Sequence, residues 1–445
     1  MKNTYPSELI SLVTALHAQG IELYAVGGCV RDRLRGEAIR DIDLSGPATP
    51  EQMRSACKRA GVRCVPVNVR LGTLLLQWDG LSFEYTTFRT ESYPAGGSHR
   101  PSSVAFTTSM EADAHRRDFT VNALYENVLT GEITDPTGGV SDLQQRILKT
   151  TSADPADILR DDGLRILRLI RFGVAMGFEI EPATWESAKA HVALLSEIAW
   201  ERKRGELDRI LLHERVYQAL DLLHRVGALP YLLPELAECD GVQQRRDHHK
   251  YDVLHHCFHA CECAPPILEL RLAALLHDVG KPPCKKAEGN LYLHDVYGER
   301  ISRRMLERLT YSREQTDRIA FLVRTHMFDL SDAASEEKLR KRFCMWGPEK
   351  VRELIAIREA DVRGNGYQTK YTATRWRATL ERMIEEQVPF CGVGLAVNGA
   401  DIMRELGLPP GTAVGHIKRK LVLHVGLHPK DNTKERLLKR MHDYR

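Results

Sequence analysis

Residues 26–43 read VGGCVRDRLRGEAIRDID, and this stretch decides the fold of the first third of the chain. A short apolar run leads into two glycines, and two aspartates separated by one residue end the stretch. Gly27 and Gly28 have no Cβ, so their backbone N–H groups can approach a phosphate closely. Side chains two residues apart on a strand share a face, so Asp41 and Asp43 are predicted to project together.

The close pair of carboxylates indicates a site for divalent cations. The two charges repel each other unless cations lie between them, and Mg²⁺ prefers such hard oxygen ligands. Glu84, in a strand-like run at 82–89, is a candidate third carboxylate. Arg31, three residues after Gly28, is placed to pair with a triphosphate oxygen. Two ions held here would support phosphoryl transfer by activating an attacking hydroxyl and stabilising the leaving pyrophosphate.

Periodicity divides the chain into a mixed first part and a helical remainder. Within the first 150 residues, turn residues separate strand-like runs at 23–28, 41–44, 72–78 and 82–89. After residue 155, Leu and Ile recur at three- and four-residue spacing, most clearly at 158–172 and 268–276. We therefore expect an α+β fold in which an α/β head precedes an all-helical remainder.

Composition favours a multidomain cytoplasmic protein. The 445 residues are 43% apolar, enough for two or more domains, and no apolar run is long enough to span a membrane. The start lacks the basic and apolar segments of a secretory signal. The ten cysteines include no CxxC pair, which fits reduced thiols. One cluster fits buried helix positions better than a zinc site: Cys257, Cys261 and Cys263.

The end of the chain is locally basic. From Gly411 to Arg445, nine Lys or Arg outnumber three acidic residues. Such an excess suits a polyanionic partner, and a solvated helix face is the equal alternative.

Residues 161–172 read DDGLRILRLIRF and are predicted to lie on one helix. After Asp162, an arginine follows at every third position: Arg165, Arg168 and Arg171. On a helix, each of these side chains would neighbour the next. The alternative explanation of this spacing is a set of surface ion pairs. Each such pair would stabilise the helix by only about 0.3–0.5 kcal/mol and would imply no further function for the motif.

Asp162 and Arg165 also have the chemistry to select bases. Cytosine and adenine both present an exocyclic amino donor beside a ring-nitrogen acceptor, whereas guanine and uracil present a carbonyl and an N–H. A carboxylate accepts from the amino group while a guanidinium donates to the ring nitrogen. These two side chains could therefore select C and A, and reject G and U, without a nucleic-acid template.

A second constellation of metal-binding residue types follows residue 240. Its members are His256, the adjacent pair His277 and Asp278, and then His294, His326 and Asp361. Imidazole and carboxylate groups suit a divalent transition metal, and the adjacent pair could hold two ions or brace one. His255 is the alternative first ligand, and chance clustering among eighteen histidines is the alternative explanation.

The order of these motifs resembles that of the class II tRNA nucleotidyltransferases and the related bacterial poly(A) polymerases, within the polymerase-β superfamily. Residues 116–123 (RRDFTVNA) are similar to the family's second motif, and 135–143 (DPTGGVSDL) to its third, which joins head and neck. The second motif implies contacts with the ribose and phosphates of the incoming nucleotide from Arg116, Arg117, Asp118 and Asn122. Residues 161–165 resemble the family's Glu-Asp-x-x-Arg motif, whose acid and arginine pair with the base, with Asp161 in place of its Glu.

Two further segments extend the resemblance. The pattern of His, His-Asp and a distant Asp resembles the HD-domain superfamily of metal-dependent phosphohydrolases. The glycine-containing segment between Arg89 and His115 resembles the family's flexible loop, which helps the change from C to A addition. The resemblance implies a polymerase-β-like nucleotidyltransferase head at 1–150, a helical neck at 151–240, an HD-like domain at 241–375, and a basic helical tail binding tRNA at 376–445.

The activity implied by this resemblance is template-independent addition of C, C and A to tRNA 3′ ends. The implied substrates are CTP, ATP and tRNA, and the implied cofactor is Mg²⁺ bound by Asp41 and Asp43. The enzyme is expected to be cytoplasmic and to have no membrane partner. Three alternatives stay open: an enzyme that adds only A, a poly(A) polymerase, and an HD phosphohydrolase whose head only binds RNA.

Overall fold

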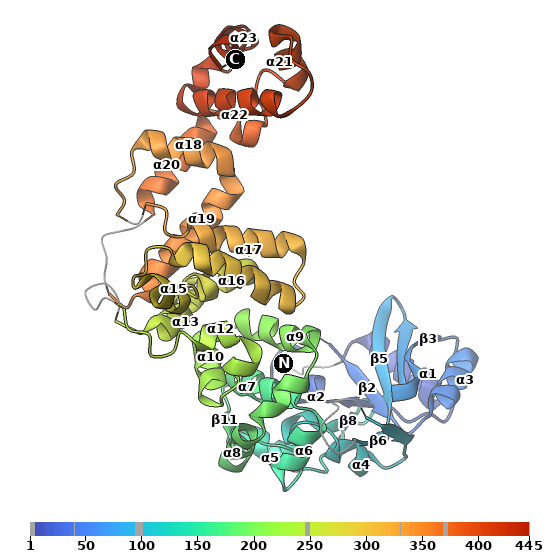
Figure 1. Cartoon of the computed structure of the whole chain (residues 1–445). Helices are drawn as coiled ribbons and strands as arrows, with labels where there is room; N and C mark the ends of the chain where they lie inside the picture. Colours follow the sequence, from blue (N-terminus) through green and yellow to red (C-terminus); the bar gives the residue numbers. More distant parts are fainter. Residues whose placement is uncertain are drawn as a thin grey trace. The chain divides into compact units, whose positions relative to one another are not determined.

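The computed structural model describes residues 5–39, 41–93, 101–244, 250–329, 331–367 and 373–444 (Figure 1). The chain forms two compact units. The first consists of Met1–Arg209 and Asp221–Leu232, and the second of Ile210–Leu220 and Leu233–Arg445. Within the described ranges, no helix has both the length and the apolar character needed to cross a bilayer.

In the described part of the first unit, seven strands form a mixed sheet in the order β3-β4-β5-β2-β1-β8-β9. The strands are β1 (Tyr24–Val26), β2 (Asp43–Gly46), β3 (Arg63–Asn68), β4 (Thr73–Trp78), β5 (Leu81–Thr87), β8 (Tyr125–Asn127) and β9 (Ile133–Thr134). β2 and β5 are parallel, and the other neighbours are antiparallel. The runs at 23–28, 72–78 and 82–89 each contain a strand or most of one, and the run at 41–44 contains the first half of β2, which begins at Asp43 rather than Asp41.

Two helices pack on one side of this sheet because their apolar side chains recur at helical spacing. They are α1 (Ser7–His17), which buries Leu9, Leu12 and Leu16, and α3 (Pro50–Ala60). These side chains share one hydrophobic cluster with Tyr85 of β5. The cluster fixes the strands that carry the predicted carboxylates.

Shorter elements complete the head. They are α2 (Gly28–Leu34), η1 (Val69–Leu71), β6 (Arg89–Ser92), β7 (Ser103–Phe106), α4 (Met110–His115), η2 (Thr120–Asn122), α5 (Gly139–Gln145) and β10 (Ile147–Leu148). β6 and β7 form an antiparallel hairpin. The segment between Arg89 and His115, expected to be a flexible loop, contains this hairpin and α4, and its residues 94–100 are outside the described part of the chain.

The chain after residue 155 is helical in its described parts except for β11 (Glu179–Ile180), which pairs in parallel with β10. The first helices are α6 (Pro155–Asp161), α7 (Leu164–Met176), α8 (Pro182–Ala190), η3 (Val192–Glu197), α9 (Trp200–Leu211), α10 (Val216–Arg225) and α11 (Leu229–Leu232). The expected α+β class is therefore confirmed.

The prediction of one continuous helix over 158–172 is wrong. α6 ends at Asp161, and Asp162 is extended, with φ −151° and ψ 102°. Gly163 then begins α7 as its N-cap. A Cβ on Gly163 would lie 2.8 Å from the Leu194 Cβ, which explains a glycine at this close approach. Asp162 therefore lies at a break between two helices rather than in line with the arginines of α7.

The second unit is built from the remaining helices. They are α12 (Pro234–Ala237), α13 (Val253–Cys263), α14 (Leu268–Leu276), α15 (Lys281–Glu288), α16 (His294–Arg308), α17 (Arg313–Thr325), α18 (Glu336–Trp346), α19 (Pro348–Gly364), α20 (Thr374–Glu385), η4 (Phe390–Gly392), α21 (Gly399–Leu406), α22 (Thr412–Leu427), η5 (Pro429–Asp431), α23 (Lys434–Met441) and η6 (His442–Tyr444). α14 coincides with the predicted helix at 268–276. α13 packs against α14 and α19, and α16 against α17.

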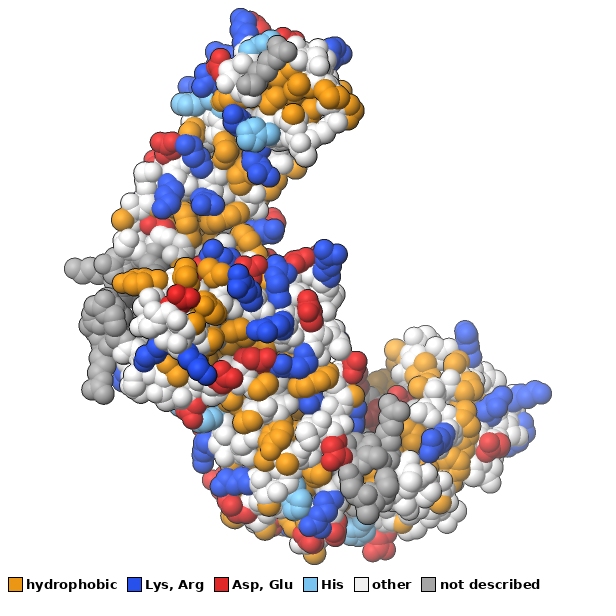
Figure 2. All heavy atoms as spheres, viewed as in Figure 1, with side chains coloured by type: hydrophobic (Ala, Val, Ile, Leu, Met, Phe, Trp, Pro, Cys, Tyr) orange, Lys and Arg blue, Asp and Glu red, His pale blue; other side chains and the backbone are white. Residues whose placement is uncertain are grey.

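The last three α-helices, α21 to α23, form a separate small core around buried residues such as Ile402, Leu421 and Leu437. Their surface carries Lys and Arg side chains (Figure 2), including exposed Arg440. The helical arrangement leaves the basic residues of the chain end on the outside, as both sequence interpretations of this segment require.

Candidate functional site

Strand pairing places two of the predicted carboxylates side by side in the head. Asp43 is the register partner of Val26 on one side and of Glu84 on the other. Asp41 lies two residues before Asp43, and all three acidic residues are exposed. Because Gly27 follows Val26 directly, the glycine turn starts beside the acidic cluster formed by Asp41, Asp43 and Glu84.

Burial and, secondarily, like charge raise the pKa values of two carboxylates of the acidic cluster, Asp43 and Glu84. Partial burial and the neighbouring charge of Asp41 raise the pKa of Asp43 above its ordinary value, while Arg117 opposes this shift. Partial burial and Asp43 likewise raise the pKa of Glu84. Carboxylates that destabilise one another in this way fit a divalent cation, whose positive charge relieves the repulsion.

The glycine turn is held against the second predicted motif. Gly27 has φ +76°, a left-handed conformation that favours glycine, and its N–H donates to the Leu124 carbonyl at 3.1 Å. Gly28 begins α2. From this helix Arg31 is buried and donates through Nη1 to Asn122 Oδ1 at 2.6 Å. Two predicted nucleotide-binding side chains are therefore in direct contact.

Asp113 holds both arginines of the second motif. Its Oδ1 accepts from Arg116 Nη2 at 2.6 Å, and its Oδ2 accepts from Arg117 Nη2 at 2.9 Å and from Tyr125 Oη at 2.6 Å. Burial alone would raise the pKa of Asp113, but Arg117 and Arg116 together lower it to about 2. Because Arg117 also lowers the pKa of Asp43, its charge acts on the acidic cluster.

We expect Asp113→Asn to lower the free energy of unfolding at pH 7 by about 2 kcal/mol, since each pKa unit corresponds to roughly 1.36 kcal/mol. The folded-state pKa of Asp113, about 2, lies below the ordinary value of 3.8. The ionised carboxylate therefore stabilises the fold above about pH 4, and this contribution disappears as the pH falls toward 2. Thermal unfolding from pH 7 to pH 2 should show the two proteins converging in acid. A constant difference would contradict the charge pairing.

A chain of polar contacts joins the second motif to α7. Asp118 Oδ2 accepts from Arg168 Nε at 2.8 Å, and Asp118 Oδ1 accepts from Asn122 Nδ2 at 3.2 Å. Burial alone would raise the pKa of Asp118, but Arg168 lowers it. Four residues predicted to bind the nucleotide thus form one connected series: Arg31, Asn122, Asp118 and Arg168.

Arg171 has a different partner. Its Nε donates at 2.6 Å to Glu206 of α9, and Glu206 also forms a longer ion pair with Arg168, at 3.9 Å. The Arg171 guanidinium lies 4.0 Å from the centre of the Phe172 ring. Arg171 therefore anchors α7 to α9 in the structure.

The two residues predicted to select the base are each held in place by neighbours. Arg165 is buried and donates to the carbonyls of Ile158 at 2.9 Å and Arg116 at 2.8 Å. Asp162 pairs with Arg202 of α9, with Arg202 Nη2 at 2.6 Å from Asp162 Oδ2. The bond to the Arg116 carbonyl places Arg165 against the second motif, within the same compact unit as the acidic cluster.

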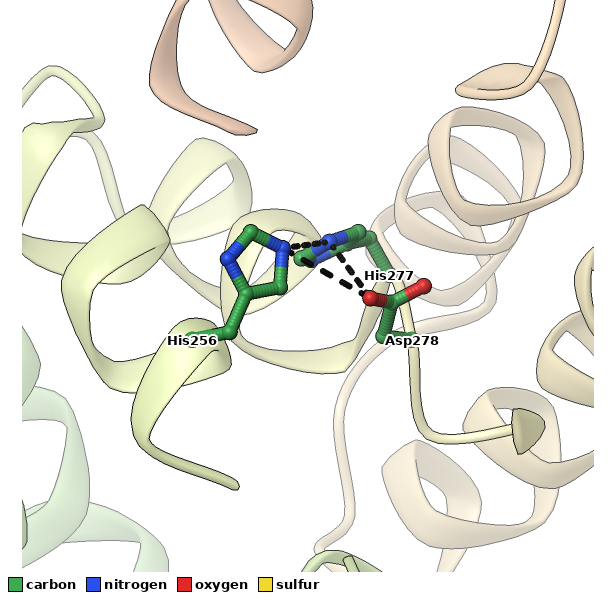
Figure 3. A group of neighbouring side chains, drawn as sticks. All are labelled: His256, His277 and Asp278. Carbon is green, nitrogen blue, oxygen red and sulfur yellow. Dashed lines mark hydrogen bonds and ion pairs between the residues drawn. The ribbon is translucent and has the colours of Figure 1, made fainter. Parts of the chain in front are cut away.

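A second site lies in the other unit, where His256 of α13 meets His277 and Asp278 at the end of α14 (Figure 3). His256 Nε2 and His277 Nε2 are 3.0 Å apart, and Asp278 Oδ2 lies 3.2 Å from His277 Nε2. All three are buried. Asp361 of α19 approaches the same group, with its Oδ1 3.1 Å from His256 Nε2.

The other carboxylate oxygen of Asp278 serves a second group. Asp278 Oδ1 lies 3.3 Å from His294 Nε2 and 3.8 Å from His326 Nε2, and the two imidazole Nε2 atoms are 3.2 Å apart. Asp278 thus belongs to two triads, one with His256 and His277 and the other with His294 and His326. In each triad the ligand atoms lie close enough to share an ion. Burial and the charges of His277 and His294 lower the pKa of His326 to about 3, which favours the neutral imidazole that binds metals.

The structure thus brings all six predicted residues of the second constellation together around Asp278. His255 instead contacts Asp252, with Nδ1 2.8 Å from Asp252 Oδ1. Cys257 and Cys261 are buried on α13. Within the described residues, no thiol belongs to a group that could hold a metal ion.

Sequence reasoning missed four residues that organise the two sites: Asp113, Arg202, Glu206 and Lys281. The spacing of Asp113 from Arg116 and Arg117, three and four residues along α4 and its end, was a usable signal of pairing. Lys281 pairs with Asp278 across three residues. The contacts of α9 join residues 35 to 40 positions apart, so no local spacing indicates them.

Family models of known proteins match three successive parts of the chain. The family model of the poly A polymerase head domain matches residues 23–149. A model described as the probable RNA and SrmB-binding site of polymerase A matches 177–240, and the HD domain model matches 246–365. The fold and sites therefore define a protein with a poly A polymerase-type head joined to an HD domain.

A CCA-adding enzyme of Streptococcus gordonii is 31% identical over 425 residues, which cover 94% of this chain and 93% of that relative. The chain belongs to the family of CCA-adding enzymes. Other relatives align over less: a CCA-adding enzyme of Anoxybacillus flavithermus is 39% identical over 230 residues, so the chain matches about half of its length (56%).

Solved structures agree on the fold. The Bacillus stearothermophilus CCA-adding enzyme in complex with CTP has a TM-score of 0.74 and 25% identity, covering 98% of this chain and 96% of that chain. The Thermotoga maritima CCA-adding enzyme complexed with tRNA has a TM-score of 0.60 and 18% identity, covering 99% and 96%. The second likeness shows the fold alone.

Proposed function

We propose that this chain adds C, C and A to the 3′ ends of tRNA, using CTP and ATP and no nucleic-acid template. The observation that carries the proposal is the placement of the acidic cluster beside the Gly27 turn, with the charge of Arg117 acting on Asp43. Membership of the CCA-adding family and the full-length match support it. Of the alternatives, the A-only enzyme and the poly(A) polymerase share this head and are separated by experiment.

The acidic cluster would hold divalent ions, which the family implies and which we propose to be Mg²⁺. Its exposed carboxylates present the hard oxygen ligands that Mg²⁺ prefers. Bound there, the ions would supply activation of the tRNA 3′-hydroxyl and charge neutralisation at the α-phosphate and leaving pyrophosphate. The chain's own contribution is to place Asp43 beside Glu84 through the β2 and β5 register, with Asp41 two residues before Asp43.

The triphosphate would lie over the glycine turn. There the backbone N–H groups at the start of α2 and the guanidinium groups of Arg31 and Arg117 supply donors and positive charge. The connected series from Arg31 to Arg168 keeps these groups in place without relying on the nucleotide. Arg116 would contact the nucleotide while its carbonyl holds Arg165.

Base selection would fall to Asp162 and Arg165. The carboxylate accepts from the amino group of cytosine or adenine, and the guanidinium donates to the ring nitrogen. A guanidinium has five N–H donors, and the two backbone carbonyls take two of them. Guanine and uracil would place a carbonyl against the carboxylate and are rejected by like polarity.

The remaining parts of the proposal concern the partner and its location. The four-part division at 1–150, 151–240, 241–375 and 376–445 is supported by the family models of head and HD domain. The basic surface of α22 and α23 would bind tRNA through its backbone charge and shape. Such an enzyme would act where tRNA matures, in the cytoplasm.

The test is extension of a tRNA that lacks its CCA end, with each nucleoside triphosphate supplied separately and together. We expect CTP alone to give two additions, ATP to complete the end, and GTP and UTP to give none. Addition of A only, onto tRNA ending in CC, would identify a partial enzyme instead. A long A tail on unrelated RNA would identify a poly(A) polymerase.

A second function is favoured by the buried histidine site. Its two triads share Asp278, so we propose a pair of divalent transition-metal ions and a metal-dependent phosphohydrolase activity there. The six ligands fit such ions, which when bound would activate water for attack on a phosphate ester. This activity would coexist with transfer at the head, because the two sites use different residues. Hydrolysis of p-nitrophenyl phosphate with Ni²⁺ or Co²⁺ tests it, with His277→Ala as the inactive control.

A further inference from the structure

Arg202 of α9 donates two hydrogen bonds to the carboxylate of Asp162, which lies at the break between α6 and α7. Arg202 Nη2 is 2.6 Å from Asp162 Oδ2, and Arg202 Nη1 is 3.3 Å from Asp162 Oδ1. Two parallel bonds of this kind fix the plane of a carboxylate as well as its position. The Asp162 side chain is only 16% exposed, although Arg202 itself is 40% exposed.

Asp162 is held by contacts from outside a regular helix. Asp162 is extended between two helices, so no helical turn restricts its side chain. Its Oδ1 also accepts from the Leu164 N–H at 3.1 Å, at the first turn of α7. Arg202 thus adds a side-chain contact at each carboxylate oxygen to the backbone bond at Oδ1.

α9 is itself anchored one turn further along. Glu206, four residues after Arg202, accepts from Arg171 of α7 at 2.6 Å and is buried. Residues four apart share one helix face, so Arg202 and Glu206 both face the segment formed by Asp162 and α7. This double attachment holds the Arg202 guanidinium at a fixed place relative to Asp162.

We propose that Arg202 is a specificity-determining positioning residue that orients Asp162 for selection of C and A. This inference rests on the proposed role of Asp162 in base selection. A guanidinium offers donors only, so the carboxylate that it holds is kept as an acceptor. An acceptor fixed in one plane accepts from the amino groups of cytosine and adenine and repels the carbonyls of uracil and guanine.

The experiment compares single-nucleotide incorporation by the full chain, measured as kcat/KM for CTP and UTP on tRNA lacking its end, and for ATP and GTP on tRNA ending in CC. Arg202→Met removes the guanidinium and keeps an unbranched apolar stem, and Arg202→Lys keeps the charge without the planar fork. Arg204→Met is the matched control, because Arg204 pairs with Asp208 on the same helix. The ratio between nucleotides is independent of the amount of folded enzyme.

We expect Arg202→Met to reduce the preference for CTP over UTP by at least about fivefold, the lower end of what a bidentate contact contributes to base discrimination. Arg202→Lys should lie between Arg202→Met and the parent, and Arg204→Met should match the parent. If Arg202→Met keeps the parent preference, or binds CTP more tightly at unchanged preference, Arg202 does not orient the selecting carboxylate.

Asp162→Asn separates this inference from the function on which it rests. An amide presents both a donor and an acceptor, so the variant should incorporate UTP more readily than the parent. Unchanged preference in Asp162→Asn would overturn the role of Asp162 in base selection. Altered preference in Asp162→Asn together with parent preference in Arg202→Met would overturn the role of Arg202 alone.

Discussion

Asp43→Asn is expected to reduce incorporation of CTP and ATP into tRNA by about a thousandfold or more, since it removes a charged ligand from a site that must hold divalent ions. Asparagine matches aspartate in size and keeps the position in β2, so the loss would come from charge rather than from packing. Single-turnover extension of tRNA lacking its CCA end, with Mg²⁺ present, measures the effect. Asp41→Asn should behave in the same direction.

The same substitution should not destabilise the protein. The folded-state pKa of Asp43 is raised by partial burial and by Asp41, so the folded protein binds this proton more tightly than the unfolded chain does. Ionisation of Asp43 therefore costs stability as the pH rises through its ordinary range and above. Without metal, thermal unfolding of Asp43→Asn at pH 7 should occur at the same temperature as that of the parent or at a higher one.

Asp79→Asn provides the matched control, because Asp79 is exposed at the β4–β5 turn, where its φ of 46° suits asparagine. It should leave nucleotide incorporation unchanged. Retained incorporation in both Asp43→Asn and Asp41→Asn would remove the acidic cluster from the mechanism. Retained phosphohydrolase activity in Asp43→Asn would show that the histidine site works independently of the head.

Much of the head was predictable because its chemistry requires neighbours in sequence. A glycine turn after a strand and two aspartates one residue apart are local patterns, and strand alternation located Glu84 as well. The direct pairing of Asp43 with Glu84 was not predictable, because β2 pairs with β5 across the intervening β3 and β4. Which strands become neighbours depends on packing of the whole sheet.

The neck shows where local periodicity fails. The spacing of Asp162 and the three arginines fits one helix, but Asp162 is extended between α6 and α7 and pairs with Arg202 of α9. Gly163, next to it, approaches Leu194 too closely for a Cβ. A glycine inside a helical pattern is usually tolerated, so its effect depends on a partner 31 residues later, which the pattern does not contain. The roles of Arg202 and Glu206 follow from the same packing and left no sequence signal.

In the histidine site, residue types and order indicated a metal centre, but not its arrangement. Spacing alone allowed two ions or one. The structure decides how the ligands divide: one carboxylate oxygen of Asp278 faces His256 and His277, and the other faces His294 and His326. That division depends on α13, α14, α16 and α17 meeting around a single aspartate.

We expect Asp278→Asn to abolish binding of both transition-metal ions, whereas His326→Ala and His256→Ala should each weaken one ion and spare the other. The reason is that Asp278 belongs to both triads, and each histidine belongs to only one. Metal content after loading with Co²⁺ and gel filtration measures the stoichiometry, and the cobalt absorption spectrum reports the ligands that remain. Asparagine keeps the size of the buried side chain, although its contact with Lys281 loses its charge.

His259→Ala is the control for these variants, because His259 lies on α13 three residues after His256 but its ring packs against Tyr217 and Tyr251 instead. It should keep the metal content of the parent. Because a metal that binds only the folded state stabilises it, the parent and His259→Ala should also unfold at a higher temperature with Co²⁺ than without it. In Asp278→Asn this increase should vanish. Equal loss of both ions in His326→Ala and His256→Ala would contradict separate triads, and unchanged metal content in Asp278→Asn would rule out a shared aspartate.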